Sequence, residues 1–175
     1  MSTSIVRRAK AVYDNLPLPA GSAVGSVLVI VLDRVRRAPL PGPRAVQRAA
    51  GGASMAAGIA LNVWALSERR RRSNGEFQLE QPDALVTTGP YAFSRHPMYV
   101  GWWLIHLGAG VMRGTRWVAA TLPVAVLLEH VGGSLVEERE LRARFGDEYT
   151  AYAERVPRYV GLPRSRRTRP SAATS

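Results

Sequence analysis

The chain has 175 residues, a length that suits one domain, and its net charge of +11 favours an anionic partner such as a membrane surface or a nucleic acid. It contains no cysteine, which excludes disulfides, thiolate metal ligands and a cysteine nucleophile. Hydrophobic residues make up 46% of the chain and collect in blocks, with arginines between and after them. This segregation predicts a membrane protein, and no residue pattern predicts a metal site.

Four apolar segments follow one another along the chain, at residues 16–32, 49–66, 98–112 and 117–136. A spanning helix needs about 20 apolar residues, with about 17 as a lower limit. The second and fourth segments meet this length, the first is marginal and the third is short. We therefore predict an all-α fold, a polytopic membrane protein of about four transmembrane helices followed by C-terminal cytoplasmic amphipathic helices. The many glycines and alanines of the second segment suit close helix packing in lipid.

The distribution of basic residues predicts the orientation. With four spans, 17 lysines and arginines fall on the side of both termini and 7 on the opposite side. The positive-inside rule then places both termini in the cytoplasm, for a protein integral to the cell inner membrane. The arginine run 69–72 is interpreted as part of this signal and as a contact to lipid headgroups. A nucleic-acid partner is not expected, because the chain has no soluble basic domain with interleaved aromatic residues.

The region after residue 136 is predicted to be helical and amphipathic. Residues spaced by three or four form one face: Leu141, Phe145, Tyr149 and Tyr152. Gly146 and Asp147 interrupt the pattern, and Pro157 ends it. Residues 161–175 are basic and rich in proline and serine, so we expect a tail that is disordered or lies on anionic lipid.

Two polar clusters are candidates for chemistry. The stretch "GPYAFSRHPMYVGWW" at 89–103 is either an interfacial aromatic belt, which composition alone favours, or a wall of a cofactor pocket. The adjacent acids Glu137 and Glu138 either recognise a cationic ligand or are a favourable charge pair at a helix start. His106 and His130 lie inside the apolar segments, and we interpret them as buried interhelical hydrogen bonds.

Two stretches together resemble a known family. They are "LVTTGPYAFSRHPMYVGWW" and "EERELRARFGDEYTAYAERVPR", and their order and separation resemble the isoprenylcysteine carboxyl methyltransferases and the related phospholipid N-methyltransferases. The resemblance covers residues 79–160, within one membrane methyltransferase domain at 1–160. It implies methyl transfer from S-adenosyl-L-methionine to a lipid-like or prenylated acceptor at the cytoplasmic face, by carboxylate O-methylation or amine N-methylation.

The resemblance also implies roles for individual residues. The cofactor-binding positions would be Leu85, Val86, Tyr91, His96, Pro97, Met98, Tyr99 and Glu137. The family's arginine for a substrate carboxylate is replaced here by Gly133, so a carboxylate acceptor would have to pair with Arg95 or Arg158. An amine acceptor would need a proton acceptor, for which Glu138 and His96 are the candidates. The partners implied are the acceptor and membrane lipids, with no obligate protein partner.

Two other functions remain open at the level of sequence. One is an NADPH-dependent membrane reductase of a sterol-like lipid, although Glu137 and Glu138 would repel the 2′-phosphate of NADPH. The other is a non-enzymatic membrane protein with a lipid-binding basic tail.

Overall fold

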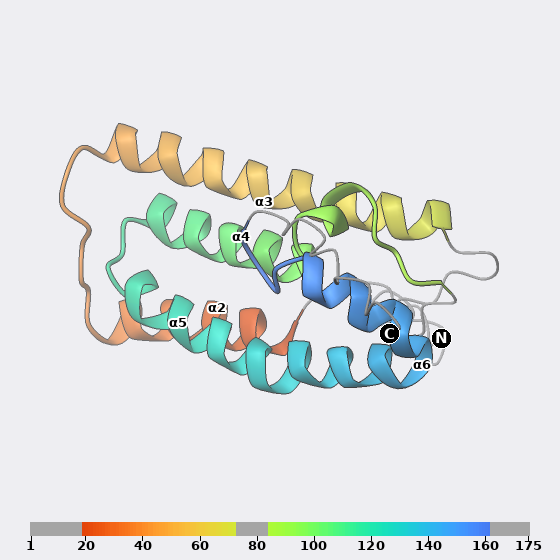
Figure 1. Cartoon of the computed structure of the whole chain (residues 1–175). Coiled ribbons are helices and arrows are strands. Elements are labelled where there is room, and N and C mark those ends of the chain that lie inside the picture. Colours follow the sequence, from red (N-terminus) through yellow and green to blue (C-terminus); the bar gives the residue numbers. More distant parts are fainter. Residues whose placement is uncertain (1–18, 73–83, 162–175) are drawn as a thin grey trace, which may run out of the picture.

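The computed structural model describes residues 19–72 and 84–161, and these residues form helices and no β-strand (Figure 1). The elements in chain order are α2 (Ala20–Val35), α3 (Arg44–Arg72), η1 (Gly89–Ala92), α4 (Pro97–Arg113), α5 (Val118–Glu129), η2 (His130–Ser134) and α6 (Leu135–Arg155). The predicted all-helical class is confirmed for this part of the chain. The expectations for the tail beyond residue 161 and for residues 79–83 lie outside the described residues.

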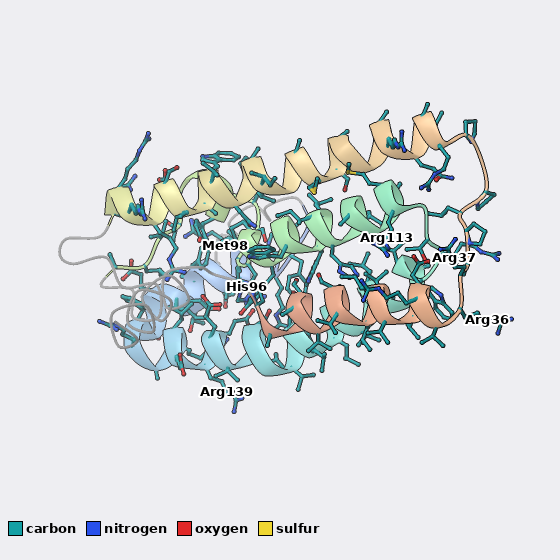
Figure 2. The ribbon with its side chains drawn as sticks, turned by 180° about the vertical axis from the view of Figure 1, so that it is seen from behind. Arg36, Arg37, His96, Met98, Arg113 and Arg139 are labelled. Atoms are coloured by element: carbon teal, nitrogen blue, oxygen red, sulfur yellow. The ribbon has the colours of Figure 1, made fainter. Side chains whose placement is uncertain are left out.

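Helices α2, α3, α4 and α5 alternate in direction along the chain (Figure 1). Helix α3 packs along α4, and α2 packs along α5. Helix α4 lies between α3 and the α2–α5 pair and contacts all three. Two loops therefore meet at one end of the bundle, and Leu40 N donates to Gly114 O across them at 2.8 Å. At the same end Arg113 Nε donates to Asp33 Oδ2 at 3.0 Å, and Figure 2 shows Arg36, Arg37 and Arg113 gathered there.

Glycines allow α3 and α4 to approach closely. A Cβ atom on Gly51 would lie 2.6 Å from the carbonyl oxygen of Gly108, and one on Gly58 would overlap the carbonyl oxygen of Gly101. Both pairs are seven residues apart along their own helices, so they mark one continuous line of backbone contact. The close packing predicted from the small residues of segment 49–66 is thus confirmed.

Two helices are long and apolar enough to cross a membrane. One is α3, and the other is the continuous helix Val118–Arg155 that α5, η2 and α6 form together. These correspond to the second and fourth apolar segments, which met the length requirement in the sequence. Helices α2 and α4 have 16 and 17 residues. Four membrane spans therefore stay a prediction.

Helix α6 bends at Gly146, whose φ of 51° and ψ of −123° are not helical. The interruption predicted at this glycine is confirmed. After the bend the chain turns back toward the beginning of α4 (Figure 1). The predicted amphipathic face packs inward, because Tyr149 and Tyr152 are buried and Leu141 and Phe145 pack against them.

Candidate functional site

The carboxylate of Glu138 is the centre of a buried ion cluster where α6 meets the beginning of α4. Arg158 donates to it from Nε at 2.7 Å and from Nη2 at 2.9 Å. Arg95 Nη1 lies 3.1 Å from the second carboxylate oxygen, and His96 Nε2 lies 3.1 Å from the first. Burial raises the pKa of Glu138, but the hydrogen bonds from His96 and Arg158 and the arginine charges outweigh it and lower the pKa to about 2.

His96 joins this cluster to the neighbouring acid. Its Nδ1 lies 3.3 Å from Glu137 Oε2, so each ring nitrogen faces a carboxylate. Burial lowers the pKa of His96, while the hydrogen bonds to Glu137 and Glu138 raise it, and the net direction is upward. The pKa of Glu137 is lowered, because its contacts with His96 outweigh its desolvation. The geometry therefore favours an imidazolium between two carboxylates.

Backbone hydrogen bonds fix the two predicted stretches against each other. Arg95 N donates to Pro157 O at 3.0 Å, and His96 N donates to Arg158 O at 3.1 Å. Pro97 begins α4, where the missing N–H of proline costs no helical hydrogen bond. As a result, "SRHP" and "VPR", which lie about sixty residues apart in the sequence, form one wall.

An open cleft lies beside the ion cluster, and its volume of about 400 Å³ includes the solvent at its mouth. Its lining residues come from α3, the segment before α4 and both halves of α6: Arg69, Ala84, Leu85, Val86, Tyr91, Arg95, Glu137, Leu141, Tyr149 and Tyr152. One wall is thus charged and the other is aromatic.

Two buried hydroxyls in this cleft, those of Tyr91 and Tyr149, have no hydrogen-bond acceptor among the described residues, because the guanidinium groups beside them, of Arg69 and Arg95, can only donate. Burial raises the pKa of both phenols, so both remain protonated donors. Buried polar groups without a partner are uncommon in native proteins and point to a missing water or ligand. Tyr152, in contrast, donates to Tyr91 O at 2.8 Å and holds the two segments together.

The cleft fits S-adenosylmethionine chemically. The ligand carries a sulfonium cation, an α-amino group and a carboxylate, together with polar nucleoside groups. The Glu137 carboxylate and the tyrosine faces suit its cationic groups, and the arginines of the charged wall suit its carboxylate. The two unpaired phenols offer hydrogen bonds to its polar groups.

The structure brings together part of the predicted cofactor set. Leu85, Val86, Tyr91 and Glu137 line the cleft, and His96 lies behind Glu137. Pro97, Met98 and Tyr99 form the first turn of α4 and do not line it. Figure 2 shows Met98 near His96, at this start of the helix. Of the residues predicted to act on the acceptor, Arg95 lines the cleft while pairing with Glu138, and Arg158 is bound to the same acid.

Sequence reasoning missed several lining residues. Leu141, Tyr149 and Tyr152 were recognised only as a helix face, although their shared spacing was a usable signal. Arg69 carried no such signal, because it begins a run of four arginines that reads as a lipid contact.

A second polar group lies around Tyr159, just after α6. The Tyr159 hydroxyl donates to Ser134 Oγ at 2.9 Å and lies 2.8 Å from His130 Nδ1. The Tyr159 ring packs edge-on against Trp103, with ring centroids 4.8 Å apart. His106 lies 3.0 Å from Thr121 Oγ1 of α5 and 3.4 Å from Ser26 Oγ of α2, which confirms the interhelical hydrogen bond predicted for it.

Parts of the chain are similar to known proteins. The chain is 38% identical over 92 residues to human protein-S-isoprenylcysteine O-methyltransferase, which covers 51% of this chain and 32% of the relative. It is 39% identical over 77 residues to the cobalt-zinc-cadmium resistance protein CzcN of Cupriavidus metallidurans (44% and 35%) and 31% identical over 79 residues to methanethiol S-methyltransferase of Crocosphaera subtropica (45% and 30%).

The matched residues span about a third of the length of these relatives. No solved structure matches the chain. A model of the phospholipid methyltransferase family matches residues 46–148, which include α3, α4, α5 and most of α6 with the ion cluster's Arg95, His96 and Glu138. The chain belongs to the phospholipid methyltransferase family.

Proposed function

We propose that the protein is an S-adenosylmethionine-dependent methyltransferase that acts on a lipid-like acceptor at the cytoplasmic face of the cell inner membrane. The observation that carries the proposal is the cleft that the Glu137 carboxylate lines together with the buried hydroxyls of Tyr91 and Tyr149, whose protons have no acceptor among the described residues. Family membership supports the reaction class, and two apolar helices support a membrane location.

When bound, S-adenosylmethionine supplies a methyl group on a positively charged sulfur. The residues of the cleft bind and orient it. Glu137 offers a carboxylate to the α-amino group, and His96 holds that carboxylate in place at 3.3 Å. Tyr91 and Tyr149 donate hydrogen bonds, while Leu85 and Leu141 exclude water from one side. Because methyl transfer is an in-line displacement, alignment and desolvation are the main contributions that such a site makes.

The ion cluster acts as a clamp in this proposal. Glu138 ties Arg158, Arg95 and His96 together, so it fixes the loop after α6 against the beginning of α4. A group with a pKa of about 2 and partners on both oxygens is a poor proton acceptor at neutral pH. We therefore assign Glu138 a positioning role, and we keep Arg95 and Arg158 as the groups nearest to an anionic acceptor.

Calorimetry on the detergent-purified full chain tests the proposal. We expect S-adenosylmethionine to bind and Glu137→Ala to weaken binding by about 10-fold or more, since a charge-assisted hydrogen bond contributes about 1.5–3 kcal/mol. Glu140→Ala is the matched control, because Glu140 is an exposed acid on the same helix. No binding by the wild-type protein, or equal affinities in the two variants, would refute the assignment.

A further inference from the structure

Methyl acceptors differ in whether they must lose a proton. A carboxylate reacts as it stands, whereas an ammonium or a thiol needs a base. The two residues predicted for this role are already engaged. His96 faces a carboxylate at each ring nitrogen, and Glu138 is bound by two arginines and His96. A base for a protic acceptor must therefore be sought elsewhere in the site.

The chain has three histidines, and the structure describes all of them. His106 is buried between three helices, with Ser26 near Nδ1 and Thr121 near Nε2. His130 differs from both of the others. Its Nδ1 lies 2.8 Å from the Tyr159 hydroxyl, and its Nε2 has no hydrogen-bond partner among residues 19–72 and 84–161. The side chain is half-buried, so Nε2 is open to an incoming group.

The hydrogen bonds around Tyr159 define which nitrogen of His130 carries the proton. The phenol has one proton, and it donates this proton to Ser134 Oγ at 2.9 Å. With the phenol proton directed to Ser134, the same oxygen accepts from His130, and this arrangement puts the imidazole proton on Nδ1. Nε2 is left with a lone pair, which is the form that a general base needs.

His130 also lies beside the ion cluster. It begins η2, a single π-helical turn, and such turns are frequent at functional sites. The Tyr159 ring neighbours the rings of both His130 and His96, at centroid distances of 6.0 and 5.9 Å. The next residue, Val131, is 57% exposed on the apolar helix surface. This exposed apolar surface offers an amphiphile in the lipid a route to His130.

Resting on the proposed function, we infer that His130 Nε2 is the proton acceptor for an amphiphilic amine or thiol, and that Tyr159 and Ser134 are positioning residues that hold its tautomer. The acceptor's N–H or S–H proton moves to Nε2. The freed lone pair forms the bond to the methyl carbon, and the bond from that carbon to the sulfonium sulfur breaks with its electron pair staying on sulfur. The imidazolium then returns its proton to water.

The first test reads the tautomer without any reaction. The full chain in detergent micelles, labelled with 15N-histidine, should show one neutral ring protonated at Nδ1 near pH 8, and His130→Asn should remove that signal. Tyr159→Phe should move the proton of the same ring toward Nε2. A His130 signal that is protonated at Nε2 in the wild-type protein would overturn the inference.

The second test uses three probes: dodecylamine, 1-dodecanethiol and N-acetyl-S-farnesylcysteine. His130→Asn keeps an N–H donor near the Nδ1 position and removes the base. Methylation of the amine or the thiol should fall about 10²–10⁴-fold, the usual contribution of a general base. Comparing the amine with the thiol identifies the acceptor class.

Two outcomes would refute the role of His130 as a base. One is methylation of N-acetyl-S-farnesylcysteine alone, and the other is an unchanged rate of amine or thiol methylation in His130→Asn. Calorimetry on the same variant separates this failure from that of the proposed function. S-adenosylmethionine should bind His130→Asn and the wild-type protein equally. Absence of binding in the wild-type protein would instead count against the methyltransferase assignment itself.

Discussion

At the scale of single residues, we expect removal of the buried Tyr91 hydroxyl to change ligand binding more than thermal stability. Its proton has no acceptor among the described residues, and only the donor Arg69 lies beside its oxygen, so Tyr91→Phe should change thermal stability little. The same variant should weaken S-adenosylmethionine binding about 3- to 10-fold, the effect of one lost hydrogen bond. Calorimetry and thermal unfolding in detergent measure the two effects separately.

Tyr152→Phe is the matched control for this prediction, because it makes the same chemical change a few ångströms away. Its hydroxyl donates to Tyr91 O, so its loss should cost about 1 kcal/mol of stability, or about 2–4 °C in melting temperature. If both variants destabilise the protein equally, the Tyr91 hydroxyl has a structural partner and does not serve a ligand.

The ion cluster predicts a pH dependence of stability with two limits. His96 has a raised pKa, so its contribution is complete below its ordinary value of 6.5 and is lost as pH rises through the folded value. Glu138 has its pKa lowered from 4.5 to about 2, so its contribution is complete above 4.5 and is lost as pH falls toward 2. Stability from this cluster should therefore be greatest between about pH 4.5 and 6.5.

His96→Gln isolates the alkaline limit. The difference in melting temperature between this variant and the wild-type protein should be larger at pH 6 than at pH 9, because above pH 6.5 the unfolded chain loses the histidine proton more readily than the folded protein does. A difference that stays constant from pH 6 to pH 9 would mean that folding does not raise the pKa of His96.

Part of this cluster could be predicted from the sequence. The family resemblance predicted that His96 and Glu137 belong to one site, because one lies in each of the two matching stretches. It could not show that Glu138 would be bound by Arg95 and Arg158, since that depends on the backbone pairing of residues 94–96 with residues 157–158. Arg69 was assigned to lipid for a similar reason, because its place on the cleft depends on the register between α3 and α6.

At the scale of elements, the bend in α6 determines whether the cleft closes. Gly146 has a φ of 51°, which a residue with a side chain adopts only at a cost, and a Cβ there would meet nothing within 4 Å. Gly146→Ala should therefore cost about 1–3 kcal/mol through the backbone alone. It should also weaken S-adenosylmethionine binding, since Tyr149 and Tyr152 follow the bend and line the cleft.

Gly132→Ala is the control for this prediction. A Cβ at Gly132 likewise meets nothing within 4 Å, but the residue lies in a helical turn without a positive φ. Alanine should therefore be neutral or stabilising there, by up to about 1 kcal/mol. Thermal unfolding in detergent compares the two variants, and equal effects would exclude a special backbone requirement at Gly146.

Hydropathy predicted the long helices well because apolar length is a property of the sequence alone. The segment expected at 98–112 is α4 at Pro97–Arg113, and the bend at Gly146 followed from glycine at the end of a periodic run. The π-helical turn at His130–Ser134 was not predicted, because its one extra residue per turn leaves no mark in composition. A Cβ at Gly133 in this turn would lie 2.5 Å from the Tyr99 hydroxyl, a close approach between separate helices that the sequence does not reveal.

At the scale of the whole molecule, charge divides the bundle into two ends. Arg36, Arg37 and Arg113 gather where the α2–α3 and α4–α5 loops meet (Figure 2). The cleft and ion cluster lie toward the other end, where α3 ends and α4 begins. Lysines and arginines near the membrane favour the cytoplasmic side, and the prediction of four spans assigns 17 of them to the side of the cleft and 7 to the other. In the proposed function, a cleft at the cytoplasmic end is open to the polar methyl donor from the cytoplasm, and an apolar acceptor arrives through the lipid.

The absence of native cysteine makes this orientation directly testable. Ala38→Cys places a thiol in the loop opposite the cleft, and Ala151→Cys places one on the exposed side of α6. In intact cells a membrane-impermeant maleimide should label Cys only in the Ala38→Cys variant, and the Ala151→Cys variant should be labelled after lysis. The reverse pattern would place the cleft outside the cytoplasm, away from its methyl donor. Labelling of both variants in intact cells would exclude a fold that crosses the membrane between the two ends.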